Sequence, residues 1–463
     1  MNVDVAVLGG GPAGYTAAIR AAQLGGKVAC IEREPALGGT CLRVGCIPTK
    51  AWVQSAHAYH DAQETFAKLG VQVGEPTLDF GTVASWKDGV VQQMTGGVAS
   101  LFKANGVEWV QGAGTFTSPT TIAVEGAEEV TFTSAIVATG SVPIRPPIPG
   151  IDSPRCVDST GLLAQTEVPR RLVILGGGII GCEFASIFDR FGTEVTIVEM
   201  LPSLIPTEDE DAGKELAKAF QKRGVALHLS KQCTQVDDHG EHLTVHFGDG
   251  ETVDCDLMLV SVGRAALVDG VGLEAAGVTY DRKGIGTDDR RRTNVPHIYA
   301  AGDVAGYWQL AHTGFREGEV AAENAMGHEA TVGEPAVPRP IYTDPEIAGV
   351  GLTEAQAREQ YGDAVVVGRC PWVAIARAVM SGETTGWVKT IHEKTYGELL
   401  GVVIVGPRAT DLIGEAVVAL DAESTIETVA DGVAPHPTLA EGLKEAGLVA
   451  LGRAIHLPPR RRA

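Results

Sequence analysis

The sequence predicts an α/β protein with two Rossmann-like dinucleotide-binding domains and a C-terminal α+β domain. Three observations predict this fold. A glycine-rich strand–turn–helix–strand unit occurs twice, two cysteines closely follow the first copy, and the chain ends in strands and helices that lack such a unit. With 463 residues, the chain is too long for one hydrophobic core and long enough for about three domains.

The two glycine-rich units have the same layout, at residues 3–34 and 171–200. Each is an apolar strand, a glycine turn, a helical stretch and a second apolar strand that ends in an acid. The acid follows the third glycine by 18 residues in both copies. Such glycines make the tight turn, let backbone approach a pyrophosphate and pack helix on strand, while the acid binds ribose hydroxyls. The predicted cofactor-binding residues are Gly9, Gly11, Gly14 and Glu32 in the first unit, and Gly176, Gly178, Gly181 and Glu199 in the second.

The acid of the second unit indicates which nucleotide binds there. Glu199 is followed by MLPSLIPTEDEDAG, which contains no lysine or arginine to receive a 2′-phosphate, so we expect NAD rather than NADP. The first unit directly precedes the two cysteines and should hold the cofactor that exchanges electrons with them. FAD suits this role because a flavin takes two electrons from a dithiol and returns them as hydride.

The two cysteines, Cys41 and Cys46, lie in the run GGTCLRVGCIPTK. In a regular helix, residues five apart are separated by about 7.5 Å along the axis, whereas a disulfide tolerates Cα separations up to roughly 7 Å. A redox pair would therefore need a distorted or entering turn, which Gly45 or Pro48 could provide. The alternative is two unpaired, partly buried thiols. The six other cysteines are scattered in mostly apolar surroundings, and we interpret them as buried inert thiols: Cys30, Cys156, Cys182, Cys233, Cys255 and Cys370.

Later segments complete the predicted domains. Apolar strands at 133–141 and 255–264 both end in glycine turns, which predicts cofactor contacts from Thr139 and Gly140 and from Gly263. A further buried strand leads to Asp303. From about Pro338, strands alternate with helices and the nucleotide pattern is absent. We predict an FAD domain, an NAD domain, a central segment that completes the FAD domain and an interface domain, at residues 1–149, 150–270, 271–338 and 339–463.

Composition excludes several classes of partner. The formal net charge of −21 argues against nucleic acid and anionic membranes, although backbone N–H groups can still bind phosphates. No apolar run reaches the length of about 18 residues that a membrane-spanning helix needs. The N-terminus enters a strand at once and leaves no room for a signal peptide. We therefore expect a cytoplasmic protein.

Taken together, the chain resembles the flavin-dependent pyridine nucleotide–disulfide oxidoreductases over its whole length. The matching runs are GGTCLRVGCIPTK, GGGIIGCEFASIF, AAGDV, YTDPEIAGVGLTE and HPTLAE. The resemblance implies a homodimer whose C-terminal domain is the dimerisation domain. It further implies that Cys46 is the flavin-proximal, charge-transfer sulfur and that Cys41 exchanges with the substrate.

The resemblance also assigns the remaining site residues. His436 matches the family's catalytic base, held by Glu441 and supplied to the partner subunit's active site. Lys50 and Glu183 match the ion pair beside the flavin ring, and Asp303 matches the acid that binds the ribityl chain. Simpler interpretations exist: Glu441 also fits a capping box, and Lys50 and Glu183 could be surface charges.

The resemblance implies oxidation of dihydrolipoyl groups with FAD and NAD as cofactors, and docking to the lipoyl-bearing acyltransferase of a 2-oxo-acid dehydrogenase complex. A glutathione-type reductase conflicts with Glu199, and mercuric-ion and large thioredoxin reductases need a cysteine pair after Cys370 that is absent. An NADH oxidase or transhydrogenase would not need both the dithiol and the base. A purely docking, non-redox role would leave the dithiol and the base without a use. Arg43 departs from the usual asparagine and could alter the cysteine pKa, and Ala265 begins a departure after Arg264.

Overall fold

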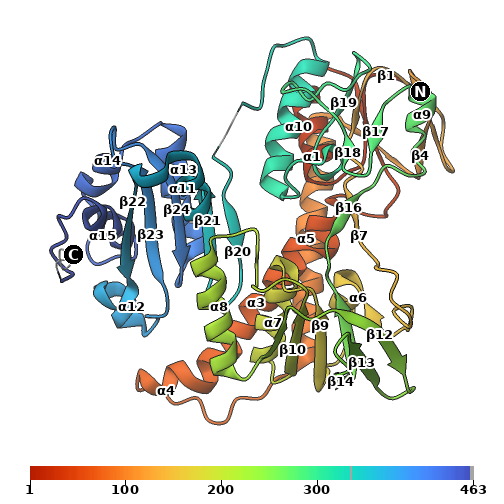
Figure 1. The fold of residues 1–463 in the computed structure, drawn as a ribbon. Helices are drawn as coiled ribbons and strands as arrows, with labels where there is room; N and C mark the ends of the chain where they lie inside the picture. Colours follow the sequence, from red (N-terminus) through yellow and green to blue (C-terminus); the bar gives the residue numbers. More distant parts are fainter. Residues whose placement is uncertain (334–335, 459–463) are drawn as a thin grey trace.

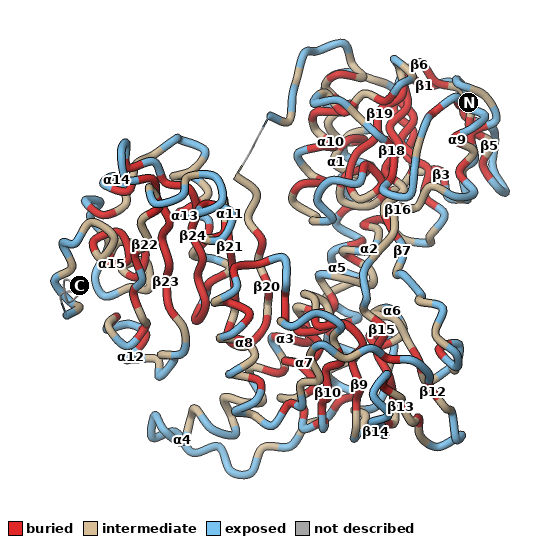
Figure 2. The backbone as a smooth tube through the Cα atoms, viewed as in Figure 1, coloured by how far each residue is buried: buried red, intermediate tan, exposed pale blue. Residues whose placement is uncertain are grey.

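The structure, a computed structural model, describes residues 1–333 and 336–458. Figure 1 shows three lobes, each built on its own sheet: one with β1 near the N-terminus, one with β9 and β10, and one with β22–β24 near the C-terminus. The buried segments in Figure 2 concentrate in the strands of these three sheets.

The first lobe is a seven-stranded sheet in the order β3-β2-β1-β6-β5-β4, with β19 added beside β6. Strand β1 pairs in parallel with β2 and β6, as expected for strands joined by helical crossovers. The strands are β1 (Asn2–Leu8), β2 (Val28–Glu32), β3 (Glu108–Gln111), β4 (Gly114–Ser118), β5 (Thr121–Val124), β6 (Val130–Val137) and β19 (Ile298–Ala300).

Helices α1 (Pro12–Gln23) and α10 (Ala311–Ala325) lie side by side against this sheet (Figure 1). The glycine at position 318 allows this close approach, because a Cβ there would lie only 2.3 Å from the Ala13 carbonyl oxygen. The remaining helices of the first 105 residues are α2 (Gly39–Val44), α3 (Cys46–His60), the π-helix η1 (Asp61–Thr65), α4 (Phe66–Lys68) and α5 (Phe80–Asn105).

The second lobe repeats the parallel arrangement. Its five-stranded sheet has the order β11-β10-β9-β15-β8, beside an antiparallel sheet β12-β13-β14. Its strands are β8 (Cys156–Val157), β9 (Arg171–Leu175), β10 (Glu194–Glu199), β11 (Ala226–Leu229), β12 (Cys233–Asp238), β13 (Leu243–Phe247), β14 (Thr252–Cys255) and β15 (Leu257–Val260). Its helices are α6 (Ser159–Leu163), α7 (Ile179–Arg190) and α8 (Glu210–Arg223).

Short elements connect the first two lobes. Strands β7 and β16 pair with each other where the chain leaves and re-enters the first lobe. These two connecting strands are β7 (Ser141–Pro143) and β16 (Arg264–Ala266). Four further short elements pack into the core of the first lobe, and they are α9 (Leu273–Ala276), β17 (Tyr280–Asp281), β18 (Gly284–Ile285) and the 3₁₀ turn η2 (Asp303–Ala305).

The third lobe is an antiparallel sheet in the order β20-β21-β24-β23-β22, with its helices packed around it. Its strands are β20 (Arg339–Ile341), β21 (Ile347–Gly351), β22 (Val365–Pro371), β23 (Trp387–Glu393) and β24 (Leu399–Val405). Its helices are α11 (Glu354–Tyr361), η3 (Gly362–Ala364), η4 (Trp372–Ala374), α12 (Ala376–Ser381), α13 (Ala409–Asp421), α14 (Ile426–Asp431) and α15 (Glu441–Ala450).

The predicted fold class is confirmed: two lobes with largely parallel sheets, of which the first also has antiparallel strands β4 and β5, precede an α+β lobe. Strand β19, from the predicted central segment, adds to the first sheet beside β6. The domain boundaries themselves stay a prediction, and residues 459–463 of the last domain lie outside the described residues. Within the described part of the chain, every helix is too short or too polar to cross a membrane.

Candidate active site

The turn after β1 is shaped by its three glycines. Gly9 has φ +107°, and Gly11 is the extended residue that caps α1. A Cβ on Gly14 would lie only 1.8 Å from the Gly9 carbonyl oxygen, whereas the nearest neighbour of a Cβ on Gly11 is 3.7 Å away. The Glu32 carboxylate accepts a hydrogen bond from Gly10 N at 2.7 Å and so ties the end of β2 to the turn.

The turn after β9 reproduces this geometry. Gly176 has φ +109°, Gly178 caps α7 in the same extended conformation, and a Cβ on Gly181 would lie 2.1 Å from the Gly176 carbonyl oxygen. Glu199 accepts hydrogen bonds from Gly177 N and Leu201 N, both at 2.7 Å. Each turn thus leaves open space before the helix N-terminus, which a pyrophosphate fits.

Both turns open into one cavity of about 2070 Å³. Its wall includes Cys41 and Cys46 from the segment between the two turns, and Thr139, Gly140 and Gly263 from the strand ends predicted to contact cofactors. The structure therefore brings every predicted cofactor-contacting strand end to the space that the dithiol also faces.

The dithiol lies at a break between two helices. Helix α2 ends at Val44 and α3 begins at Cys46, with Gly45 between them at φ −142°, ψ −113°. A Cβ on Gly45 would lie 2.8 Å from the Thr40 carbonyl oxygen. The expected distortion is thus confirmed at Gly45, while Pro48 lies in the first turn of α3, where a missing N–H costs nothing.

The two thiols, which are free in this structure, differ in their electrostatics. The Cys41 thiol donates a hydrogen bond to Cys46. This bond, helped by the Lys50 ammonium and opposed by burial, lowers the pKa of Cys46 to about 7. The same hydrogen bond and burial raise the pKa of Cys41 above its ordinary value. In the reduced pair, the thiolate therefore resides on Cys46, at the first position of α3, where the helix dipole also favours an anion.

Lys50 and Glu183 form an ion pair beside the dithiol. Lys50 Nζ lies 2.7 and 2.9 Å from the two carboxylate oxygens of Glu183, and the Glu183 side chain is only 6% exposed. Burial disfavours the charge on Lys50, but the Glu183 carboxylate and Cys46 outweigh it and raise its pKa. A pair of surface charges is therefore the wrong interpretation of these two residues.

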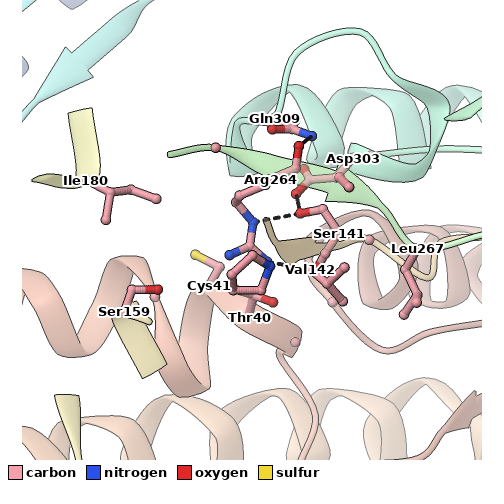
Figure 3. Close-up of a pocket in the computed structure, with 18 of the residues that line it drawn as sticks. Thr40, Cys41, Ser141, Val142, Ser159, Ile180, Arg264, Leu267, Asp303 and Gln309 are labelled. Carbon is pink, nitrogen blue, oxygen red and sulfur yellow. Dashed lines mark hydrogen bonds between the residues drawn. The ribbon is translucent and has the colours of Figure 1, made fainter. Parts of the chain in front are cut away.

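Asp303 belongs to a hydrogen-bonded group that also lines the cavity (Figure 3). The Ser141 hydroxyl donates to Asp303, and Arg264 donates to the Ser141 hydroxyl and carbonyl oxygens, both at 2.7 Å. Neither Ser141 nor Arg264 was among the predicted site residues, although each directly follows a predicted glycine. Arg43 donates to Glu34 at 2.8 Å, and the charges that act on the two sulfurs come from Lys50, Glu183 and Asp303.

His436 and Glu441 form the predicted pair on the third lobe. His436 Nδ1 lies 2.9 Å from Glu441 Oε1, and because a carboxylate only accepts, Nδ1 carries the proton and Nε2 is left as the base. Glu441 Oε2 accepts from Thr438 N at 2.9 Å. Although burial opposes them, these hydrogen bonds lower the pKa of Glu441. The capping-box interpretation is wrong, because α15 begins at Glu441 with Ala440 as its N-cap residue and without a side-chain cap, and the Thr438 hydroxyl donates to the Pro435 carbonyl oxygen instead.

The His436 side chain is 71% exposed and does not line the cavity of its own chain. Among the described residues, His436 and Glu441 are the two predicted catalytic residues that do not line the cavity with the dithiol.

This combination of two dinucleotide turns, a dithiol and one shared cavity defines a nucleotide-dependent redox protein. The chain belongs to the pyridine nucleotide-disulphide oxidoreductase family: the family model matches residues 3–318, and the model of its dimerisation domain matches residues 337–447. The family confirms the predicted FAD and NAD cofactors and the oxidoreductase class.

Curated relatives cover almost the whole chain. A dihydrolipoyl dehydrogenase of Bacillus subtilis (strain 168) is 41% identical, covering 98% of this chain and all of its own, and the mitochondrial dihydrolipoyl dehydrogenase of Pisum sativum is 41% identical, covering 98% and 92%. Among solved structures, LpdA of Mycobacterium tuberculosis matches with a TM-score of 0.89 at 28% identity, covering 96% and 99%. The HOCl-induced flavoprotein disulfide reductase RclA of Escherichia coli, as its Cu(II) complex, matches with 0.88 at 30% over the same shares.

Proposed function

We propose that this protein is a dihydrolipoyl dehydrogenase, which oxidises dihydrolipoyl groups through the Cys41–Cys46 pair with FAD and NAD as cofactors. The observation that carries the proposal is the dithiol itself. One thiol has a pKa lowered to about 7, and the pair lines a cavity onto which both dinucleotide turns open. The curated relatives that cover the chain end to end carry this activity in their names.

The residues of the first turn, together with Asp303 and the Lys50–Glu183 pair, suit FAD. Gly11 offers a close backbone approach and Glu32 a carboxylate for ribose, while Asp303 and the Lys50–Glu183 pair line the same cavity and match the family's residues around the flavin. In the second turn, Gly178 and Glu199 suit NAD. When bound, FAD takes up the two electrons of the dithiol and NAD receives them as hydride.

The chain's own residues carry out the thiol exchange. His436 Nε2 takes the proton from one dihydrolipoyl thiol, and the resulting thiolate attacks Cys41 Sγ. A bond forms from the substrate sulfur to Cys41, the Cys41–Cys46 bond breaks, and Cys46 leaves as a thiolate. The second substrate thiol then attacks the first substrate sulfur, which releases Cys41 and the cyclic disulfide, while the protons pass to His436 and Cys41. Two electrons have moved from substrate to the cysteine pair.

The position of His436 supports an active site shared between subunits. His436 is exposed and does not line its own cavity, so it would act in the cavity of a second copy. The chain carries the family's dimerisation domain. The proposed assembly is a homodimer that serves the lipoyl-bearing acyltransferase of a 2-oxo-acid dehydrogenase complex.

The test is NADH formation from dihydrolipoamide and NAD by the purified flavoprotein, with NADP in place of NAD and oxidised glutathione plus NADPH run alongside. We expect rapid turnover with NAD only. Turnover of glutathione with NADPH, and none of dihydrolipoamide, would contradict the proposal and indicate another disulfide substrate.

Serine variants of the two cysteines test whether the dithiol carries the reaction. Cys41→Ser and Cys46→Ser should each lower dihydrolipoamide oxidation by about a thousandfold or more, because no disulfide can form. Both should keep bound FAD and the oxidation of NADH by ferricyanide, which bypasses the dithiol. Full dihydrolipoamide turnover in either variant would overturn the exchange scheme.

A further inference from the structure

Side chains from three separate parts of the chain meet beside the dithiol. Lys50 comes from α3, the helix that begins at Cys46, and Glu183 comes from α7 of the second lobe. Tyr342, from the third lobe, directly follows β20 and also lines the cavity. The predicted ion pair therefore has a third member.

Tyr342 contacts both members of the ion pair. The Lys50 ammonium lies 4.6 Å from the centroid of the Tyr342 ring, a cation–π distance. The Tyr342 backbone N–H donates to Glu183 Oε1 at 3.0 Å, the oxygen that also accepts from Lys50 at 2.9 Å. The ring attracts the ammonium, while the backbone of the same residue orients the carboxylate.

The ring is held in place by docking along one face of α7. Besides the contact to Glu183, the Asp344 backbone N–H donates to Ser186 Oγ at 3.1 Å. Arg190 Nε donates to the Asp344 carboxylate at 3.0 Å. Glu183, Ser186 and Arg190 are spaced three and four residues apart and so share a helix face. Successive contacts along this face fix the segment that carries the ring.

A fixed ammonium matters because Lys50 has a long and flexible stem. Its charge is one of the contributions that stabilise the Cys46 thiolate. If Nζ swings away, this contribution falls steeply with distance. Without the ring, Lys50 Nζ would be held by the Glu183 carboxylate only. The Tyr342 ring adds a second attractive contact from another side chain.

We propose that Tyr342 is a positioning residue of the redox centre, whose ring holds the Lys50 ammonium against Glu183 and beside Cys46. Through Tyr342, the third lobe thereby influences the dithiol without contacting either sulfur atom. The proposal rests on the proposed function only in taking Cys46 as the thiolate next to the flavin, and it requires no particular disulfide substrate.

The test monitors the Cys46 thiolate directly. A thiolate beside an oxidised flavin gives a long-wavelength charge-transfer absorbance, which is titrated against pH in the holoenzyme after reduction by one equivalent of dithionite. The variants are Tyr342→Leu, which removes the ring, Tyr342→Phe, which keeps it, Lys50→Met, and the double variant of Lys50→Met with Tyr342→Leu. Flavin content and size-exclusion elution establish that each variant is assembled.

Loss of the ring should raise the pH midpoint by about half a unit, the shift that a partly exposed cation–π contact converts to. The Phe variant should keep the wild-type midpoint. In the Lys50→Met background, removal of the ring should add no further shift, because the ring acts through the ammonium. If Tyr342→Leu does not assemble, Tyr342→Phe still tests the proposal, because a shifted midpoint in a variant that keeps the ring would contradict it.

Three results would overturn the proposal: an unchanged midpoint in Tyr342→Leu, an equal shift in Tyr342→Phe, or the same shift with and without Lys50. The titration is independent of the substrate assay. If the protein does not oxidise dihydrolipoamide but the variants show these midpoints, the proposed function is contradicted and the positioning role of Tyr342 is supported.

Discussion

The two dinucleotide units have nearly the same backbone geometry and hydrogen bonds at their glycine turns. Gly9 and Gly176 have φ values of +107° and +109°. The acids that end the second strands, Glu32 and Glu199, both accept from the middle N–H of the glycine run at 2.7 Å. The helices after the turns, α1 and α7, are both 12 residues long. The same local sequence thus builds the same phosphate-ready turn twice.

The units differ in the segment after the acid. After Glu32 the chain enters α2 and the dithiol. After Glu199 it enters a segment without lysine or arginine and then α8, whose start is bonded to Lys389 of the third lobe. The acid itself is 7% exposed in the first unit and half-buried in the second. The turn therefore provides binding in both units, and the downstream segment decides which chemistry the bound nucleotide serves.

The largest expected effect comes from filling the turns. Gly14→Ala places a Cβ 1.8 Å from Gly9 O and should weaken FAD binding by about tenfold or more, and Gly181→Ala, at 2.1 Å from Gly176 O, should weaken NAD binding to a similar extent. The comparison predicts separable losses: Gly181→Ala should purify with full FAD. Flavin absorbance and NAD titration measure both.

Gly286→Ala is the control for these glycine variants, because a Cβ there meets nothing within 4 Å. It should bind both cofactors normally. Loss of FAD in Gly181→Ala would show that the two units do not bind independently.

Sequence reasoning succeeded where a site depends on neighbours in the chain. The glycine turns, their acids and the helix break at Gly45 are local patterns with one conformational solution each. The Lys50–Glu183 pair, 133 residues apart in the chain, was obtained from family resemblance and is bonded as expected. Local physics alone would not have paired these two charges.

It failed where a role arises from tertiary contact between lobes. Tyr342 lies 159 residues from Glu183 in sequence and carries no local sign of a position over Lys50. Arg264 was noted as the end of a strand, yet its bonds to Ser141 depend on the pairing of β16 with β7. Such contacts result from lobe packing, which no periodicity encodes.

A second effect, on the free energy of unfolding rather than on cofactor binding, should come from the contact with the third lobe that only the second unit has. The Lys389 side chain is 2% exposed and contacts Asp209 at 2.9 Å, Asp211 at 2.7 Å and Glu354 at 3.1 Å. Lys389→Met would leave Asp209, itself 3% exposed, without its counter-ion, at a cost of about 3–5 kcal/mol in the free energy of unfolding. Urea denaturation measures it, with Lys214→Met on the exposed face of α8 as a control that should change little.

The same contact should show a pH dependence with a defined sign. Although burial opposes it, the hydrogen bond from Lys389 lowers the pKa of Asp211 below its ordinary value of 3.8. Because the folded-state pKa is the lower one, the stabilisation is present above pH 3.8 and is lost as the pH falls through the folded-state value. In Lys389→Met, the free energy of unfolding should no longer fall in this way at acid pH. If its dependence on acid pH is the same as in the wild type, Lys389 does not stabilise the ionised Asp211.

The smallest effect should fall on nucleotide choice at the second unit. Lys231, whose backbone N–H donates to the Glu199 carbonyl oxygen, has its ammonium paired with Asp249 and Glu251, so it offers little to a 2′-phosphate. Glu199→Ala should lower kcat/KM for NAD by about tenfold, because a charged acceptor for ribose is lost and two backbone N–H groups are freed. The value for NADP should change less, since the variant loses a repulsive carboxylate there, and Glu199→Gln should lie between. Equal losses for NAD and NADP would mean that Glu199 only braces the turn, in which case the second unit owes its selectivity to residues beyond its acid.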